Sequence, residues 1–504
     1  MKLTGFLKKY DHLLAAVAAF YVVYLFARYS GIGISPDSIM YASTARNIAA
    51  HGQFNFFNGS PLVDFPLFYP TFLSIVLKLS GVDPIKAGPV LDGLIFAAVI
   101  WLSGYITLKF KNPSWLYKWL IVLLVLLSPA LLQVYTYLWS ETLFILLTLV
   151  FFIAYRQFQL KRNIANLILV ALIAAIASVT RYAGVTLIAT GGFLLLVDLS
   201  LPLRRKIIYL FTYGPISIAL LAANIIRNAI ASGTSTGPRE PSVTPFIQNL
   251  AYFGNVICGW FSFPSTSNTV GILVGSVVLI SFITAIIIKI LRRRVNGYEM
   301  IALTFALIYG AFIILSSTFS RYERINDRLL SPMYIPFLWA CTSWLPKLLK
   351  WRRFNPQLAE GLVVVVILLF VDYGLAKTDY QRYDDQFDYG VPGYTDDSWN
   401  TSKFVDFLRK HPQLFHQGIP VYSDAYEAAY FFTGQTVKLL PHRFFEQNIA
   451  DFYKLKRFRL IWFKDLDNPE LISLKDIVKQ RKLKKLFDFP EGAVYDYDES
   501  SSTQ

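Results

Sequence analysis

The chain has 504 residues, of which 55% are hydrophobic and 16% charged, and its mean hydropathy is +0.45. Because soluble proteins average about 25% charged residues, this composition excludes an ordinary soluble protein and indicates a membrane protein. The net charge of +15 does not indicate nucleic-acid binding, because Lys and Arg cluster in short loops between apolar segments, as in cytoplasmic loops of membrane proteins. Cys258 and Cys341 lie in unlike contexts and the five histidines lack paired spacing, which predicts neither a disulfide framework nor a protein-only metal site.

The N-terminal segment, residues 1–11, carries lysines that predict a cytoplasmic N-terminus. The apolar segment 12–29 has no cleavage-site pattern and is interpreted as a signal anchor. Residues 67–81 are too short to span a bilayer comfortably and are predicted to form a re-entrant or interfacial helix. Further spans are predicted at residues 85–108, 115–134, 139–156, 163–180, 182–199, 206–228, 269–291, 299–317, 329–346 and 358–375.

The distribution of basic residues predicts the orientation of these spans. Clusters near Lys109, Arg156, Arg204, Arg292 and Lys347 all fall on one side if the spans alternate, which makes that side cytoplasmic. This agreement predicts an even number of spans, about ten, and an outward-facing C-terminus. The membrane is expected to be the cell (inner) membrane. The first outer loop is expected at residues 31–84, with interfacial helices.

The composition changes at about residue 377, where charged residues and Tyr become frequent. Short apolar runs at 419–422, 436–440 and 459–463 alternate with helical patterns at 398–410, 424–433 and 469–480, which predicts a small α/β domain. The fold class is therefore an α-helical polytopic membrane domain, residues 1–376, followed by an extracytoplasmic α/β domain, residues 377–504. Because that domain shows no glycine-rich phosphate loop and no metal signature, we expect recognition or docking there instead of catalysis.

The segment directly after the first span carries the first candidate site residue. Ser35 is a good helix N-cap, Pro36 suits the first helical position, and Asp37 falls in the first turn. This helix is expected to end at Gly52, and Tyr41 shares the face of Asp37. An acid in the first turn is already favoured by the helix dipole, but ionisable groups at a membrane face are costly and tend to serve function.

Polar residues predicted on the outer side form a wider set. The acids are Asp37, Asp64, Glu141 and Asp327, and the bases are Arg46, Arg181, Arg321, Arg324 and Arg328. The arginines of residues 320–332 break the orientation rule, which favours a phosphate site for the cluster, although pairing with Glu323 and Asp327 is the alternative. Arg181 can equally be a residue that snorkels to the interface, and Glu141 can simply begin a helix with Ser140 as its N-cap.

Five short motifs on this predicted side occur in a characteristic order. They are Ser35-Pro36-Asp37-Ser38-x-x-Tyr41-x-x-x-Ala45-Arg46-Asn47, Pro66-Leu67-Phe68-Tyr69-Pro70, Ser140-Glu141-x-Leu143-Phe144, Thr180-Arg181-Tyr182-x-Gly184 and Asp327-Arg328-Leu329-Leu330-x-Pro332. Over about residues 10–375 the chain resembles the GT-C glycosyltransferases, especially the branch of protein O-mannosyltransferases and bacterial aminoarabinose transferases of lipid A. Residues 377–504 are similar to extracytoplasmic domains appended to bacterial members.

The resemblance implies an inverting membrane enzyme that uses a polyprenyl-phosphate sugar as donor and a lipid, glycan or protein of the envelope as acceptor. The family's catalytic acid corresponds to Asp37. Since Ser38 stands where members often carry a second acid, Asp64 is the nearest second carboxylate. The donor-phosphate candidates are Arg181, Arg321, Arg324 and Arg328, and the supporting candidates are Tyr41, Arg46, Glu141, Tyr182, Tyr322 and Asp327. No cofactor is expected to be required, no metal site is assigned, and a divalent cation remains an option.

Two other functions fit the composition. A polytopic transporter or lipid flippase would commonly show internal repeats and helices broken at matched positions, and no convincing repeat is present. A non-catalytic scaffold whose outer domain binds envelope glycans is the third hypothesis.

Overall fold

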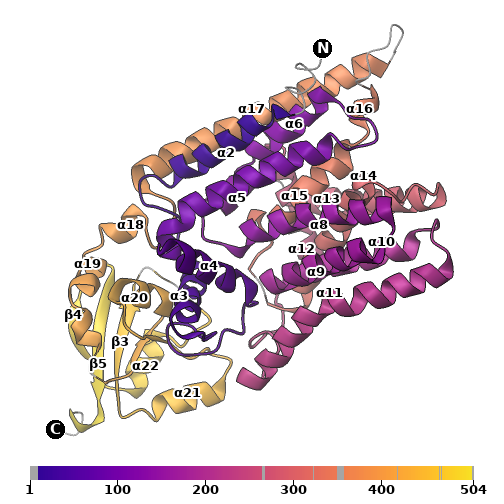
Figure 1. The fold of residues 1–504 in the computed structure, drawn as a ribbon. Coiled ribbons are helices and arrows are strands. Elements are labelled where there is room, and N and C mark those ends of the chain that lie inside the picture. Colours follow the sequence, from indigo (N-terminus) through magenta and orange to yellow (C-terminus); the bar gives the residue numbers. More distant parts are fainter. Residues whose placement is uncertain are drawn as a thin grey trace.

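A computed structural model of the chain describes residues 10–263, 267–321, 323–348, 357–416, 418–464, 466 and 468–501. The structure is mostly helical, with a bundle of long apolar helices and a small sheet near the C-terminus (Figure 1). The sheet and its helices lie beside one end of the bundle, next to α3 (Pro36–His51) and α4 (Phe68–Ser80). The predicted fold class, a polytopic helical protein with a small C-terminal α/β part, is confirmed.

Every predicted span is matched by helix in the structure. The helices are α2 (Leu13–Phe26), α5 (Pro84–Thr107), α6 (Trp115–Leu126) with α7 (Pro129–Tyr135), α8 (Ser140–Lys161), α9 (Ile164–Thr180), α10 (Val185–Val197), α11 (Leu203–Ser232), α13 (Asn268–Leu291), α14 (Tyr298–Phe319), α15 (Asp327–Thr342) and α17 (Gln357–Tyr389). Six of these helices are long and apolar enough to cross a bilayer alone, and α6 and α7 form a pair bent by 55°. The protein is therefore a membrane protein.

The number of helical segments can be compared with the expected number of spans. In the described part of the chain, the matched segments number eleven when α6 and α7 are counted as one. An odd number of crossings is needed if the two ends of the chain are to lie on opposite sides of the membrane. The expectation of an even number of spans, about ten, with an outward-facing C-terminus stays a prediction.

The short helices outside the main bundle include one that was predicted closely. Helix α3 begins after Ser35, whose side chain accepts a hydrogen bond from the backbone N–H of Ser38, and it ends at Gly52 in the left-handed conformation with φ of +69°. Helix α4, which matches the predicted interfacial segment, has 13 residues. Helix α12 (Phe246–Gly259) was not predicted, because it lies in a long segment interpreted as an outer loop.

The chain continues from α17 into a five-stranded sheet with the order β2-β1-β3-β5-β4. Strands β1 (Val421–Ser423), β2 (Lys438–Leu439) and β3 (Arg457–Phe463) are parallel, while β5 (Gly492–Asp498) runs antiparallel to β3 and to β4 (Lys484–Asp488). The helices are α18 (Asp397–Asn400), α19 (Lys403–Lys410), α20 (Tyr426–Thr433), α21 (Glu446–Tyr453) and α22 (Leu474–Gln480). We call the elements from α18 to β5 the sheet unit.

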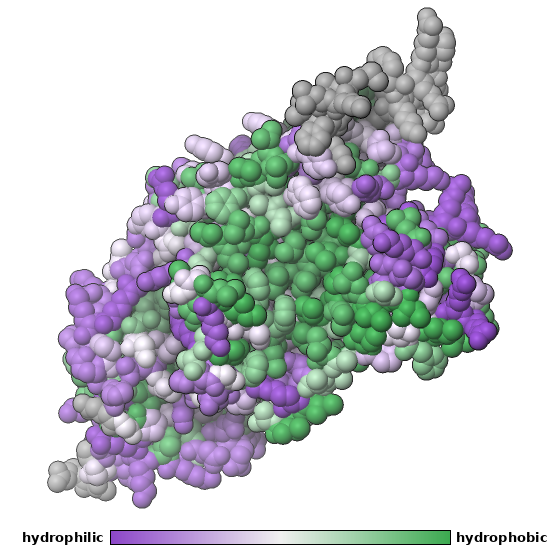
Figure 2. Space-filling view, viewed as in Figure 1, coloured by the Kyte–Doolittle hydropathy of each residue, from purple (hydrophilic) through white to green (hydrophobic). Residues whose placement is uncertain are grey.

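The sheet unit is joined to the start of the bundle by a shared hydrophobic core. This core contains Ile34 and Tyr41 next to Phe404, Phe432 and Ile461. In the space-filling view, apolar side chains cover the middle of the bundle and hydrophilic ones dominate the sheet unit (Figure 2). Because burial of apolar area stabilises contacts in proportion to that area, the shared core fixes the sheet unit against α3 and the segment that leads into it.

Candidate active site

One pocket of about 210 Å³ lies where the N-terminal ends of three helices meet. Asp37 lies in the first turn of α3, Glu141 in the first turn of α8, and Arg328 is the second residue of α15. Helix N-termini carry partial positive charge and unpaired backbone N–H groups. Their convergence therefore favours carboxylates here and also favours an anionic ligand.

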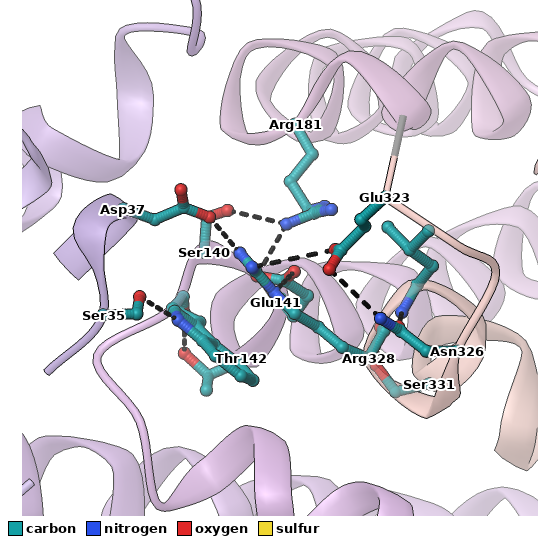
Figure 3. Close-up of polar contacts among 12 residues, drawn as sticks. Ser35, Asp37, Ser140, Glu141, Thr142, Arg181, Glu323, Asn326, Arg328 and Ser331 are labelled. Carbon is teal, nitrogen blue, oxygen red and sulfur yellow. Dashed lines mark hydrogen bonds and ion pairs between the residues drawn. The ribbon is translucent and has the colours of Figure 1, made fainter. Parts of the chain in front are cut away.

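Arg328 is the centre of the charged cluster. Its guanidinium pairs with the Asp37 carboxylate, and its Nε donates to Glu141 Oε1 at 2.7 Å. Figure 3 shows Asp37 and Glu141 reaching this one side chain from two elements. The guanidinium also lies 4.1 Å from the ring centroid of Trp139, whose indole N–H donates to Ser35 Oγ at 2.7 Å. The stacked indole thus orients Arg328 and connects it to the cap of α3.

Arg181 is the second guanidinium of the cluster and lies at the break between α9 and α10. Its Nη1 is 2.6 Å from Glu141 Oε2 and donates to Ser140 Oγ at 3.0 Å (Figure 3). Its Nε has no hydrogen-bond partner among the described residues. The turn that places it is tight, because a Cβ on Gly184 would lie 2.3 Å from the carbonyl oxygen of Ala177. Arg181 therefore faces the pocket with donor capacity left over.

The two carboxylates that pair with Arg328 differ in how far their side chains are exposed. The Glu141 side chain is fully buried, whereas 25% of the Asp37 side chain is exposed and lines the pocket. Glu141 is shared by Arg181 and Arg328, so it holds the two guanidiniums together. Asp37 is the carboxylate that a substrate can reach.

Asp64 lines another side of the same pocket. Burial raises the pKa of its carboxyl above the ordinary value, and the positive charge of Arg239, another lining residue, opposes the shift. The backbone approaches this carboxylate closely at Gly237, where a Cβ would lie 1.9 Å from Asp64 Oδ1 and φ is +78°. A carboxylate with a raised pKa is the better general base.

Two tyrosines from the sequence-predicted set also line the pocket. Tyr41 O–H lies 3.1 Å from Ser140 Oγ, which also accepts from Arg181. Tyr182 O–H donates to the carbonyl oxygen of Val63 at 3.0 Å and accepts from Asn228 at 3.0 Å. The structure thus brings together Asp37, Tyr41, Asp64, Glu141, Arg181, Tyr182 and Arg328.

Four residues predicted for this set lie elsewhere. Arg321 pairs with Glu240 at 2.8 Å and with Glu470 of the sheet unit at 2.7 Å. Arg324 lies 4.1 Å from the ring centroid of Tyr252. The Arg46 guanidinium binds Asp83 with contacts of 2.7 and 3.0 Å. Arg321 and Arg46 thus pair with carboxylates outside the pocket, and Arg324 lies against an aromatic ring.

The fourth residue, Asp327, accepts a hydrogen bond from the indole N–H of Trp260 at 3.0 Å and does not line the pocket. Tyr322 lies outside the described residues. The alternative in which Ser140 is the N-cap of α8 is wrong. Trp139 holds that position, and Ser140 is the first helical residue. Its hydroxyl binds Tyr41 and Arg181 instead.

Sequence reasoning missed Arg239, and it assigned Glu323 only to local pairing. Arg239 comes from the long segment between α11 and α12, which carries no motif, so only the three-dimensional structure brings it to Asp64. Glu323 lines the pocket with its Oε1 3.9 Å from Arg328 Nη1. Within the part of the chain that the structure describes, no three His, Cys, Asp or Glu side chains gather in a way that could hold a metal ion.

Comparison with known proteins finds solved structures that are similar to this chain, but no matching family model or curated sequence. No protein-family model matches the sequence, and no curated protein sequence does. ArnT from Cupriavidus metallidurans in the apo state is 14% identical, with 99% of each chain covered and a TM-score of 0.57. The same protein bound to undecaprenyl phosphate is 13% identical, with 96% of this chain and 97% of that chain covered and a TM-score of 0.57.

The archaeal oligosaccharyltransferase AglB from Archaeoglobus fulgidus, in complex with an inhibitory peptide and a dolichol-phosphate, is also similar. It is 11% identical, with 91% of this chain and 70% of that chain covered and a TM-score of 0.55. The chain therefore has the fold of the GT-C membrane glycosyltransferases, as its motifs predicted.

Proposed function

We propose that this protein is an inverting membrane glycosyltransferase. It moves a sugar from a polyprenyl-phosphate donor to an envelope acceptor on the outer face of the membrane. The observation that carries the proposal is the convergence of Asp37, Arg181 and Arg328 on one pocket, although these residues come from distant parts of the chain. The GT-C fold supports it, since similar structures hold undecaprenyl phosphate and dolichol-phosphate.

The donor's phosphate is assigned to Arg181 and Arg328, which line the pocket, and no longer to Arg321 and Arg324, which do not. Planar guanidiniums bind two phosphate oxygens at once, in a bidentate way. The three helix N-termini add partial positive charge. These groups offset the negative charge that develops on the leaving phosphate. We propose that no metal is required for this purpose, so that EDTA leaves turnover unchanged.

In the transfer step, Asp37 accepts the proton of the acceptor hydroxyl. The hydroxyl oxygen attacks the anomeric carbon of the donor sugar, and the bond from that carbon to the phosphate oxygen breaks. The bonding electron pair leaves with the polyprenyl phosphate, and attack from the opposite face inverts the anomeric centre. Without ligand, Asp37 is engaged by Arg328, so a phosphate that competes for this guanidinium releases the carboxylate to act as base.

The experiment compares Asp37→Asn with wild type in proteoliposomes supplied with a polyprenyl-phosphate sugar and a total envelope lipid and glycan extract. We expect turnover to fall by about 10²–10⁴-fold in the variant, the range typical of a lost general base. Asp83→Asn is the matched control, because Asp83 also lies at a helix N-terminus and pairs with an arginine, but outside the pocket. Turnover retained in Asp37→Asn would remove this residue from the mechanism.

A further inference from the structure

A second pocket, lined mostly by residues with polar side chains and called the polar pocket below, lies where the C-terminal end of α17 meets α7 and residues 390–398. Its volume is about 710 Å³. Side chains with amide, carboxylate and phenol groups dominate its lining, among them Gln133, Tyr137, Gln381, Asp385, Gln386 and Asp396. Amides offer donors and acceptors side by side, and carboxylates offer acceptors only. This combination matches a ligand with many hydroxyl groups.

Gln386, which lines the polar pocket, carries an unsatisfied hydrogen-bond acceptor. The side chain is only 5% exposed, and its Oε1 is buried without a hydrogen-bond partner among the described residues. A buried acceptor left unpaired costs about 1–3 kcal/mol, and such groups are rare in native proteins. A ligand hydroxyl or amine that donates to Oε1 would remove this cost.

The charge of the polar pocket restricts the ligand further. Asp385, Asp396 and Asp397 line it against one cation, Arg382, whose guanidinium already donates to the carbonyl oxygen of Pro129 at 2.6 Å. Like charges placed together disfavour binding. A phosphorylated or otherwise anionic head is therefore excluded in favour of an uncharged one.

An apolar pocket adjoins the polar pocket along the same helix. It has a volume of about 260 Å³ and is lined by side chains of α2, α6 and α17, such as Leu25 and Leu126. Asp379 lines it too, is 7% exposed, and has no hydrogen-bond partner for either oxygen among the described residues. Asp379 and Gln386 are seven residues apart, so they share one face of α17. The two pockets thus lie one after the other along this face of α17, and we call the pair the groove.

The groove adjoins the catalytic pocket without belonging to it. Tyr137 of the polar pocket stacks on Trp139, with ring centroids 4.2 Å apart and an interplanar angle of 12°. Trp139 in turn lies against Arg328, the partner of Asp37. The Tyr137–Trp139 stack thus connects the wall of the polar pocket with the guanidinium of Arg328.

We propose that this groove binds the acceptor, and that the acceptor is a membrane lipid with an uncharged, hydroxyl-rich saccharide head. The lipid tail occupies the apolar pocket, and the head donates hydrogen bonds to Gln386 and the carboxylates of the polar pocket. The assignment of this lipid as acceptor rests on the proposed transferase function, whereas its binding does not.

The test uses the full-length protein in phosphatidylcholine nanodiscs and a dodecyl maltoside with a photoreactive diazirine in its chain. We expect saturable cross-linking to α2 and α17, competed by dodecyl maltoside but not by maltose or dodecyl phosphate. Gln386→Leu, which keeps the side-chain size, should weaken binding about tenfold, as expected for one lost hydrogen bond to a buried group. Equal competition by dodecyl phosphate, or cross-linking that does not saturate, would overturn the proposal.

Leu25→Trp should also abolish cross-linking by filling the apolar pocket, and this half-exposed position tolerates the change. Leu273→Trp on α13, another exposed apolar position, is the matched control and should bind as wild type does. Asp37→Asn should bind the probe normally while transfer is lost, which separates failure of this site from failure of the proposed function. If Gln386→Leu leaves the acceptor KM unchanged, or if the transfer product is a protein, the groove is not the acceptor site.

Discussion

At the scale of single residues, Glu141 is the side chain on which the charged cluster depends. It is fully buried and contacts Arg181 at 2.6 Å and Arg328 at 2.7 Å. We expect Glu141→Gln to lower the free energy of unfolding by about 3–5 kcal/mol, because removing one partner leaves buried charges uncompensated. Thermal and denaturant unfolding of the purified protein would measure the loss, and turnover should fall with it.

Glu323→Gln is the matched control for that change. Glu323 also faces Arg328, but at 3.9 Å and with 46% of its side chain exposed. Exposed ion pairs contribute about 0–1 kcal/mol, so this variant should unfold close to wild type. If both variants lose the same stability, burial of Glu141 does not decide the energetics of the cluster.

Asp424 in the sheet unit makes stability depend on pH. Burial raises the pKa of its carboxyl to about 7, although the carboxylate accepts a hydrogen bond from the backbone N–H of Phe463. Between the unfolded pKa near 4 and the folded value, the unfolded chain ionises while the folded chain stays protonated. Stability contributed by Asp424 is therefore full below pH 4 and falls as pH rises toward 7, by at most about 4 kcal/mol.

Asp424→Asn removes this ionisation and keeps an oxygen that can accept from Phe463. We expect the variant to be more stable than wild type at pH 8, with the difference shrinking as pH falls and closing only near pH 4. Thermal unfolding of the full-length protein across this range measures it. A difference that stays constant with pH would contradict the assigned cause, since Glu427, whose pKa burial also raises to about 7, is present in both proteins.

The sequence was informative about the acids of the site and less so about the bases. Asp37 was located because helix-start chemistry and a membrane boundary coincide at one position. The three arginines of residues 320–332 were indistinguishable in sequence, since each breaks the orientation rule equally. Their difference depends on partners far away in the chain, namely Glu240 and Glu470 for Arg321 and Asp37 and Glu141 for Arg328.

At the scale of elements, the segment that leads into α3 packs closely at Gly33 against the segments that contain Val391 and Tyr137. A Cβ on Gly33 would lie 2.6 Å from Val391 Cγ1 and 2.7 Å from Tyr137 Cδ1. We expect Gly33→Ala to cost about 1–3 kcal/mol through overpacking and to lower turnover, because α3 carries Asp37. Unfolding and transfer assays on the same preparation measure both effects.

Gly192→Ala serves as the comparison for that substitution. Gly192 lies within α10, and a Cβ there would meet no atom within 4 Å. Since Ala is the better helix former, stability should stay the same or rise. A loss equal to that of Gly33→Ala would mean that close packing at Gly33 is not the reason for its effect.

Some helices and strands could be predicted from the sequence and others could not, for physical reasons. Helix α3 was predicted to its ends because a cap, a proline and a terminal glycine mark them. Strands β4 and β5 were missed, since β4 is largely exposed and short and β5 combines Gly, Asp and Tyr without a continuous apolar run. The break at Arg181 was predicted correctly, because a single apolar helix over both α9 and α10 would exceed the bilayer.

At the scale of the whole molecule, orientation follows from where charge and pocket lie. The basic loops near Arg204 and Arg292 lie at the ends of helices remote from the sheet unit, whereas α3, with Asp37, packs against that unit (Figures 1 and 2). By the positive-inside rule, we expect the basic end to be cytoplasmic. The candidate active site and the sheet unit are therefore expected together on the outer side.

Single cysteines in a background without Cys258 and Cys341 test this orientation in intact cells. Lys438→Cys in the sheet unit and Arg204→Cys in a basic loop are both exposed positions. We expect a membrane-impermeant maleimide to label Lys438→Cys at once and Arg204→Cys only after permeabilisation. The opposite pattern would place the pocket on the cytoplasmic side, where a donor presented at the outer leaflet has no access to Asp37. Equal labelling of both before permeabilisation would contradict any arrangement in which the apolar helices separate these two ends.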